Sequence, residues 1–220
     1  MSEGVQVHTI VSQPFEENTY IVWLPDRKDA LVIDPGLEPE SILIFLSDRG
    51  LTPAVILNTH GHADHIAGNA DLKRAFPQAP LVIGVNDAPM LTDARLNLSA
   101  GFGVPIISPP ADRLVVEGDV VEAAGIQLEV MDVPGHSPGH VVFLYRGSPC
   151  LLFGGDVLFC GSIGRMDLPG GNGRLLLEGI RRKVLTLPPT TTVYSGHGPV
   201  TTIEHEKRTN PFVGAGALED

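Results

Sequence analysis

Cysteine is scarce in this chain of 220 residues, which carries only Cys150 and Cys160. Two cysteines are too few for a disulfide framework, and these two do not form a Cys-X-X-Cys pair. Long apolar runs are also missing, because no stretch reaches the roughly 18–20 residues that span a bilayer. The first residues lack the basic region followed by an apolar stretch that typifies a secretory signal. These absences predict a cytoplasmic protein without a membrane partner.

Basic residues are few as well, since 15 lysines and arginines stand against 26 aspartates and glutamates, for a formal net charge of −11. A protein that binds nucleic acid needs a basic face to displace counterions from phosphates. The largest local basic cluster, residues 181–183, has the spacing of an exposed helix face. We therefore expect no nucleic-acid partner. A small anionic substrate stays compatible, because a local pocket can oppose the global charge.

Hydrophobic residues make up 43% of the chain, enough for one sizeable core. Runs of apolar, β-branched and aromatic residues bounded by turn residues predict strands at residues 5–11, 19–24, 30–33, 54–57, 81–85, 113–116, 120–123, 126–132, 140–145, 149–153 and 191–195. Helices are predicted at residues 38–48, 68–76, 174–185 and 203–209. This order predicts an α/β (α+β) chain in which helices cover two sheets.

The domain organisation is predicted to be simple, with a single domain over residues 1–212. Residues 213–220 are rich in glycine and alanine and are predicted to form a flexible C-terminal tail. Residues 86–102 fit no regular pattern and are predicted to be a helical or irregular excursion. Whether residues 86–103 form a lid stays open.

The densest group of chemically active side chains follows the predicted strand at residues 54–57. His60, His62, Asp64 and His65 lie within six residues and are separated by small residues. Residues i and i+2 of an extended stretch point the same way, so His60 and His62 are placed to grip one ion. Asp64 and His65 are placed to serve a second. Imidazole and carboxylate suit zinc, manganese or iron, and such crowding is unfavourable without a cation.

Three further candidates each follow a predicted strand: His136 in a Pro-Gly turn, Asp156 after a glycine pair, and His197 between two glycines. Loops at one edge of a rigid scaffold are the usual place for a site. Two neighbouring side chains are open to two interpretations. His140 either orients the site from behind or is an ordinary strand histidine. Asp34 either supports a metal ligand or only forms an Asp-Pro-Gly turn.

The pattern His-X-His-X-Asp-His, followed by a distant histidine, a Gly-Asp aspartate and a Gly-His-Gly histidine, resembles the metallo-β-lactamase superfamily. The resemblance implies a four-layer αββα sandwich with two divalent metal ions at one edge of the sheets. It also implies that the first metal is held by His60, His62 and His136, the second by Asp64, His65 and His197, with Asp156 bridging them.

Within the superfamily the chain is similar to the short form of the glyoxalase II (hydroxyacylglutathione hydrolase) group. Residues 15–20, 164–171 and 209–212 carry this finer resemblance. Longer enzymes of the group have a C-terminal helical region that helps to hold glutathione. Arg165 falls where they place a basic residue for the glutathione moiety, and Asp167 falls near a position where they use a tyrosine.

The resemblance implies hydrolysis of a small-molecule acyl thioester, such as lactoylglutathione, by a hydroxide that bridges the two metals. Asp64 and Asp156 would be the catalytic carboxylates and Arg165 would bind the substrate. A thioester suits a site without a spare acid, because the leaving thiol has a pKa of about 8.5. Zinc is the expected metal, with iron or manganese as alternatives. The chain is expected to be a monomer or a small homo-oligomer.

Other functions of the same scaffold stay open. Persulfide dioxygenases resemble it, use one iron held by two histidines and an aspartate, and carry a Gly-Arg-Thr-Asp stretch similar to residues 164–167. Lactone and other ester hydrolases share the metal motif. The acidity disfavours a nuclease. A non-catalytic metal scaffold is disfavoured because structural sites are usually closed by four ligands.

Overall fold

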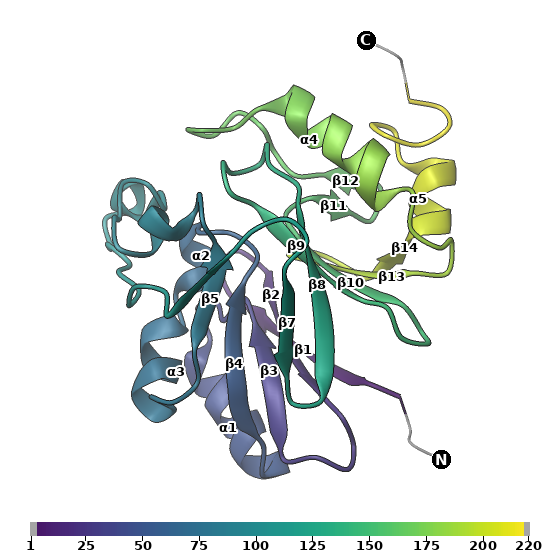
Figure 1. The fold of residues 1–220 in the computed structure, drawn as a ribbon. Coiled ribbons are helices and arrows are strands. Elements are labelled where there is room, and N and C mark those ends of the chain that lie inside the picture. The colour runs from purple at the N-terminus through teal and green to yellow at the C-terminus, as the bar shows by residue number, and fades with distance from the viewer. Residues whose placement is uncertain (1–3, 218–220) are drawn as a thin grey trace.

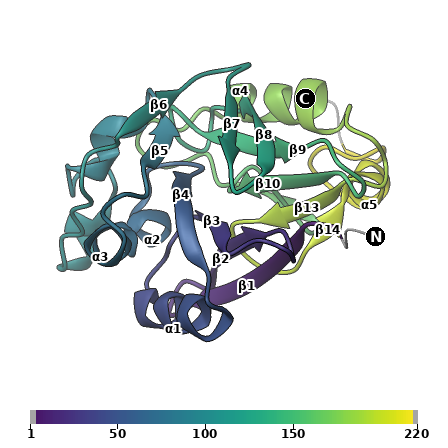
Figure 2. The same cartoon turned by 60° about the horizontal axis from the view of Figure 1, so that its bottom comes forward.

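Two six-stranded β-sheets lie face to face in the computed structural model, which describes residues 4–217 (Figures 1 and 2). The first sheet contains β1 (Gln6–Ser12), β2 (Glu17–Trp23), β3 (Asp29–Ile33), β4 (Thr52–Asn58), β5 (Leu81–Gly84) and β6 (Arg113–Val115), in that order. The second has the order β14 (Thr201–Thr202), β13 (Thr192–Ser195), β10 (Leu151–Gly155), β9 (Val141–Tyr145), β8 (Ile126–Asp132) and β7 (Val120–Ala123).

Helices cover the outer face of each sheet. On the first sheet these are α1 (Pro39–Arg49) and α3 (Asn69–Ala75), with the one-turn helix α2 (Ala63–Ile66) at its edge (Figure 1). On the second sheet they are α4 (Gly173–Gly179), the π-helical turn η3 (Ile180–Val184) and α5 (Ile203–Thr209). The result is the predicted four-layer arrangement of helix, sheet, sheet and helix.

The alternation of side chains along each strand explains the layers. In β3, Leu31 and Ile33 point into the core between the two sheets, whereas Val32 points to the helices outside. In β10, Phe153 joins the central core and Leu152 joins the core beneath α4 and α5. Because successive residues of a strand face opposite sides, strands covered on both faces are apolar throughout. Three separate apolar cores therefore hold four layers together.

Strand direction decides where the candidate site lies. In the first sheet β3 and β4 are parallel. In the second, β10 and β13 are parallel, and β8 also runs with β10 because each is antiparallel to β9. The segments that follow β3, β4, β8, β10 and β13 consequently emerge at one edge of the sandwich.

The predicted elements agree with the structure except for short pieces. The sequence did not indicate α2, β14 or the hairpin of β11 (Leu158–Phe159) and β12 (Ser162–Ile163). The helix predicted at residues 174–185 changes to π-helical geometry at Ile180. The irregular excursion contains two 3₁₀ turns, η1 (Ala88–Leu91) and η2 (Ser99–Phe102).

The C-terminal boundary differs from the predicted one. Val213 is buried in the core beneath α4 and α5, and the Ala215 N–H donates to the Lys207 carbonyl at 2.8 Å. The packed domain therefore extends beyond residue 212, while residues 218–220 of the predicted tail lie outside the described residues. Within residues 4–217, no helix has the length and apolarity needed to cross a membrane.

Candidate metal centre

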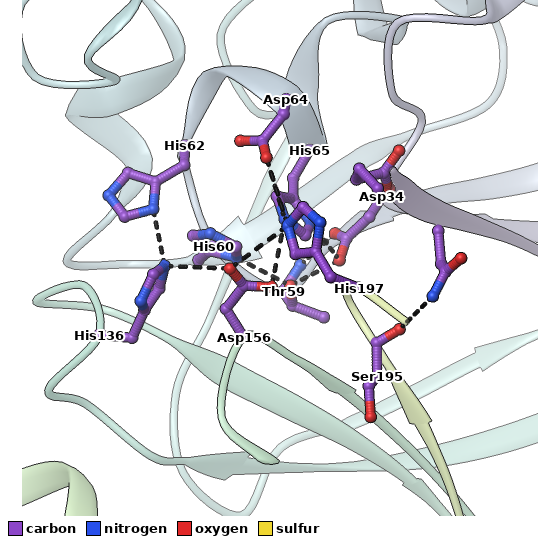
Figure 3. Close-up of polar contacts among 12 residues, drawn as sticks. Asp34, Thr59, His60, His62, Asp64, His65, His136, Asp156, Ser195 and His197 are labelled. Atoms are coloured by element: carbon purple, nitrogen blue, oxygen red, sulfur yellow. Dashed lines mark hydrogen bonds and ion pairs between the residues drawn. The ribbon is translucent and has the colours of Figure 1, made fainter. Parts of the chain in front are cut away.

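All seven side chains proposed as ligands meet at the edge where the strand ends gather (Figure 3). Those at residues 60–65 follow β4 of the first sheet. His136 follows β8, Asp156 follows β10 and His197 follows β13, all in the second sheet. Each of the two sheets thus contributes part of one site, and the site forms only when the two sheets pack together.

Two groups of three side chains form within this cluster. His60, His62 and His136 have potential ligand atoms within 4.8 Å of one another. The same limit holds for Asp64, His65 and His197. His62 Nδ1 and His136 Nε2 approach to 2.8 Å, and His197 Nε2 lies 3.4 Å from Asp64 Oδ2. The groups match the two ligand sets that the resemblance implies.

Asp156 lies between the two groups. Its Oδ2 is 3.4 Å from His136 Nε2 in the first group and 3.6 Å from His197 Nε2 in the second. Its Oδ1 is 3.4 Å from His65 Nε2. One carboxylate therefore contacts both groups, which is the arrangement needed to bridge two cations.

The outer ring nitrogens of four histidines have partners that fix the tautomer. Nδ1 of His65 is 3.1 Å from a carboxylate oxygen of Asp34, and Nδ1 of His136 is 2.9 Å from the Arg165 carbonyl. Nδ1 of His197 is 2.9 Å from the Phe15 carbonyl. These oxygens only accept, so each Nδ1 donates to them, and Nε2 is the nitrogen that each neutral ring can offer to a cation.

The tautomer of His60 is fixed in the same way, with the Thr59 hydroxyl as the partner of its Nδ1. The Thr59 hydroxyl donates to Asp34 Oδ2 at 2.6 Å, so its oxygen accepts from His60 Nδ1 at 3.1 Å. His60 Nε2 is then unprotonated and directed at the cluster. Such outer partners orient metal-binding histidines and raise their basicity.

Buried polar atoms without partners test whether cations fit here. Nε2 of His60 and His65, and Oδ1 of Asp156, are buried, have no hydrogen bond and lie within the cluster. His62 turns its Nδ1 towards the cluster instead (Figure 3). A buried polar atom without a partner is costly, and native structures usually satisfy it. Nitrogen and oxygen atoms that converge on a shared space suit divalent cations of the zinc, iron or manganese type. The donor set therefore fits two metal ions.

Burial and mutual charge shift the pKa values within the cluster. Burial lowers the pKa of His60 far below its usual range and that of His62 to about 3, so both rings are neutral and able to bind a cation. Burial opposes ionisation of Asp156, but the neighbouring His65 outweighs it and lowers the pKa of this carboxyl. The carboxylate thus stays charged at neutral pH.

The structure resolves the two open interpretations. Asp34 accepts hydrogen bonds from both the backbone N–H and the hydroxyl of Thr59, at 2.7 and 2.6 Å, and contacts His65. It is therefore a support for ligands as well as a turn residue, in a left-handed conformation with φ of 48°. His140 Nε2 accepts from the Asp156 backbone N–H at 3.0 Å, and its ring stacks on His60. Both side chains hold the ligands from behind.

Asp87 is a supporting residue that the sequence did not reveal. It is fully buried and accepts from Gly61 N–H at 3.1 Å, Ser137 hydroxyl at 2.6 Å and Gly139 N–H at 2.6 Å. These donors flank His60 and His62 on one loop and His136 on another. One carboxylate therefore ties the ligand loop of the first sheet to that of the second.

Two glycines leave the space in which the ligands meet. A Cβ at Gly196 would collide with Asp156 Oδ1, and a Cβ at Gly155 would collide with the Thr59 side chain. Gly155 also has a φ of 46°, which side chains rarely adopt. The backbone at Gly155, in the glycine pair before Asp156, therefore lies close to the Thr59 side chain.

The His197 loop is fastened to the first sheet by polar contacts from β2. The Asn18 side chain donates to the carbonyls of Ser195 at 3.0 Å and Gly198 at 2.9 Å. The Tyr20 hydroxyl donates to the same Ser195 carbonyl at 2.6 Å. These contacts hold His197 opposite Asp64 although the two residues belong to different sheets.

A cavity of about 450 Å³ opens over the cluster. His62, Asp64, His136, Asp156 and His197 line its floor, and the walls are mainly apolar. The excursion contributes one wall, so this segment covers part of the site. Arg165 lines the opposite side, but its guanidinium donates to both carboxylate oxygens of Asp167, at 2.8 and 2.9 Å.

The sequence matches a family profile described as the metallo-beta-lactamase superfamily over residues 13–197. It is 40% identical over 206 residues to the probable metallo-hydrolase YqgX of Bacillus subtilis, covering 93% of this chain and 96% of the relative. It is 35% identical over 214 residues to hydroxyacylglutathione hydrolase GloC of Haemophilus influenzae, covering 96% of this chain and 99% of the relative.

Solved structures give the same family. BLEG-1 B3 metallo-beta-lactamase superposes with a TM-score of 0.90 at 40% identity, covering 94% of this chain and 99% of the other. TTHA1623 in a di-iron-bound form gives 0.82 at 40% identity, covering 94% and 100%. ETHE1 from Myxococcus xanthus gives 0.79 at 29% identity, covering 94% and 84%.

Proposed function

The chain belongs to the metallo-β-lactamase superfamily, and from that premise we propose that it is a two-metal hydrolase of small-molecule acyl thioesters. One observation carries the proposal, namely that two three-residue ligand groups face each other across the carboxylate of Asp156. His60, His62 and His136 would hold one metal, and Asp64, His65 and His197 the other. Asp156 would serve both.

When bound, two divalent cations supply a Lewis acid for the substrate carbonyl and lower the pKa of a water molecule towards neutrality. The protein's part is to hold and orient. Asp64 lines the cavity floor with a side chain that is 21% exposed, so its carboxylate can accept a hydrogen bond from the attacking water. The apolar walls exclude other water and strengthen the electrostatic interactions at the floor.

The choice of a thioester is supported by the absence of a spare acid. Among the described residues that line the cavity, every histidine and carboxylate belongs to the two ligand groups or is Asp156. Amide hydrolysis needs a proton for its leaving nitrogen, whereas a thiolate with a parent pKa of about 8.5 departs without one. The relative GloC, named as a hydroxyacylglutathione hydrolase, supports the same choice.

Zinc is the proposed metal, and iron is the main alternative because a neighbour of 40% identity was crystallised with two irons. Arg165 is proposed to contact the substrate from the cavity wall. The proposed partners are small molecules, since the net charge of −11 disfavours nucleic acid. Metal identity does not alter the roles proposed for the side chains.

A mononuclear-iron persulfide dioxygenase is the second candidate, and the likeness to ETHE1 at 29% identity gives it some support. That reaction uses two histidines and one aspartate, and the dioxygenases keep most of the other motif residues, so the seven candidate ligands fit both candidates. The Thr-Asn-Pro-Phe sequence at residues 209–212 and the 35% identity to GloC favour the hydrolase. Lactone or ester hydrolysis on the same two metals is a further alternative.

The decisive experiment measures bound metals together with activity. We expect about two metals per chain and hydrolysis of lactoylglutathione or a simple acyl thioester that stops with a chelator and returns with zinc. A single bound iron, with oxygen uptake on glutathione persulfide and no thioester cleavage, would replace the proposal with the dioxygenase. Cleavage of lactones but not of thioesters would replace the proposal with lactone or ester hydrolysis on the same two metals.

A further inference from the structure

The walls of the cavity carry an inference about the substrate, which rests on the proposed thioester hydrolysis. At about 450 Å³ the cavity has the size of a small-molecule site. Phe15 comes from the turn between β1 and β2, Leu98 and Phe102 come from the excursion, and Val104 and Ile106 come from the residues that follow it. The polar part of the lining is the floor, made by the ligand residues, together with Asn97, Ser99 and Arg165 at the sides.

Several of these apolar side chains are open to solvent. Phe102 is 64% exposed and Val104 is 70% exposed, and the rings of Phe15 and Phe102 meet at a centroid distance of 5.4 Å. Scattered apolar residues on a surface are ordinary, but a contiguous apolar patch beside a polar floor marks a binding site. The patch is continuous with the proposed metal centre, so its natural occupant is part of the substrate.

The wall is built into the fold. Asn97 is fully buried, and its side chain donates to the carbonyls of Met90 at 3.0 Å and Ile106 at 2.9 Å. The backbone carbonyl of Asn97 accepts a hydrogen bond from the Ala63 N–H at 3.0 Å, and Ala63 precedes the proposed ligand Asp64. Leu98 then takes a left-handed conformation with φ of 73°, which persists only where the surroundings impose it. The excursion is thus anchored to the metal-binding loop.

The cavity offers little to a charged thiol carrier. Among the described residues, Arg165 is the one lysine or arginine in its lining, and its Nε and Nη2 already donate to the two carboxylate oxygens of Asp167. Glutathione brings two carboxylates, which need cationic or hydrogen-bonding partners when they leave water. The departing thiolate is also charged, so apolar walls suit the acyl half of the thioester better than the thiol half.

We propose that this cavity binds an uncharged, apolar acyl chain, and that the enzyme prefers neutral thioesters of medium-length acyl groups to glutathione thioesters. The full-length, zinc-loaded protein is assayed with acetyl, butyryl, hexanoyl and octanoyl thioesters of N-acetylcysteamine, beside lactoylglutathione. Burying two more methylenes should raise kcat/KM roughly tenfold at each step, until the cavity is full. The hexanoyl thioester should exceed lactoylglutathione.

A matched pair of variants ties the chain-length effect to the wall. Phe102→Ala should lower the octanoyl-to-acetyl ratio of kcat/KM by about tenfold, because the chain loses its apolar partner. Phe212→Ala removes another exposed phenylalanine, 44% exposed and outside this cavity, and should leave the ratio unchanged. An unchanged ratio in Phe102→Ala would count against the proposal.

Binding of non-hydrolysable S-alkyl thioethers of N-acetylcysteamine separates the two proposals. Affinity that rises with chain length, with a negative heat-capacity change in calorimetry, supports an apolar site. If such binding occurs but no thioester is cleaved, the proposed thioester hydrolysis is rejected and the proposed apolar ligand is supported. If acetyl and lactoyl thioesters are cleaved without a chain-length effect, the proposed function stands and this inference is overturned.

Discussion

At the scale of single residues, Asp156 connects the two ligand groups. Its carboxylate contacts His65, His136 and His197 within 3.4–3.6 Å. Asp156→Ala should therefore lose metal and activity together, with kcat/KM falling by more than about a hundredfold, the upper range for loss of an outer support. Metal content and thioester hydrolysis measure this. The exposed carboxylate of Asp71 gives a control, Asp71→Ala, which should keep both.

A variant Asp156→Ala that retained two metals and full activity would contradict the bridging role. Retention of one metal with partial activity would show that one group functions alone.

Asp87 makes a prediction about a carboxylate that touches no ligand side chain. An asparagine has one acceptor oxygen, so Asp87→Asn would turn an amide N–H towards a backbone N–H or the Ser137 hydroxyl. We expect a loss of about 1–3 kcal/mol in the free energy of unfolding and faster release of metal to a chelator. Urea unfolding and chelator kinetics measure the two effects. The surface change Asp71→Asn should alter neither, and equal metal release in both variants would contradict the tethering role.

The seven candidate ligands could be picked out from the sequence whereas Asp87 could not, and the reason is spatial. The ligands are of few residue types, four of them are crowded into six residues, and each group follows a predicted strand. Asp87 receives its hydrogen bonds from residues 26, 50 and 52 positions away in the chain. Nothing in its local sequence distinguishes it from a turn aspartate, because its role arises only when the two sheets pack.

At the scale of elements, the excursion depends on Asn97 for its shape. Asn97→Ala would leave the Met90 and Ile106 carbonyls without their side-chain donor. The segment should open locally while the three cores stay intact, since local stability follows local contacts. Hydrogen exchange of residues 88–106 should then accelerate at least about tenfold, as expected for a loss of 1.4 kcal/mol or more.

Asn86→Ala is the matched control, because Asn86 is exposed and lies in the same segment. Metal content should be unchanged in both variants. Global unfolding of Asn97→Ala at the same rate in all elements would show that the excursion is part of the cooperative core instead.

Long elements could be predicted from the sequence and short ones could not. α1 was expected at residues 38–48 and is found at Pro39–Arg49, where Pro39 suits the first turn and Gly50, with φ of 60°, ends the helix. α2, β11, β12 and β14 have two to four residues each, too few for a period to appear. The π-helical turn after Gly179 arises from tertiary packing, which propensity does not contain.

At the scale of the whole molecule, the cores and the site are separate sources of stability. No ligand side chain belongs to the three apolar cores of the described chain, so metal removal should leave the fold intact. A metal present at 1,000 times its dissociation constant contributes about 4 kcal/mol. For a domain of this size that corresponds to a shift of roughly 8–16 °C in Tm. Calorimetry with chelator, then with restored zinc, measures it, and complete unfolding on chelation would contradict the separation.

The metal-free protein should also show a stability maximum near neutral pH. Burial lowers the pKa of His62 from 6.5 to about 3. Between these two pH values His62 is protonated in the unfolded chain but neutral in the folded chain. Stability is therefore lost as the pH falls from 6.5 towards 3. Burial also opposes charge on His65 and His197, but Asp156 and Asp64, respectively, outweigh it and raise the pKa of each. Their contribution is complete below pH 6.5 and is lost as the pH rises through the raised values.

The loss of stability on the acid side and the loss on the alkaline side fall in separate pH ranges. Urea unfolding of the metal-free protein should therefore give its highest free energy of unfolding near about pH 6.5. His62→Ala should make the loss of stability at acid pH shallower, because one of the three buried rings whose pKa burial lowers is gone, while His60 and His140 remain. His205→Ala removes an exposed ring that is 49 residues or more in sequence from any proposed ligand except His197 and lies outside the cavity lining. This variant should keep the stability losses on both the acid and the alkaline side. A stability that rises steadily from pH 5 to pH 9 in the metal-free protein would mean that His65 and His197 are not held charged by the aspartates.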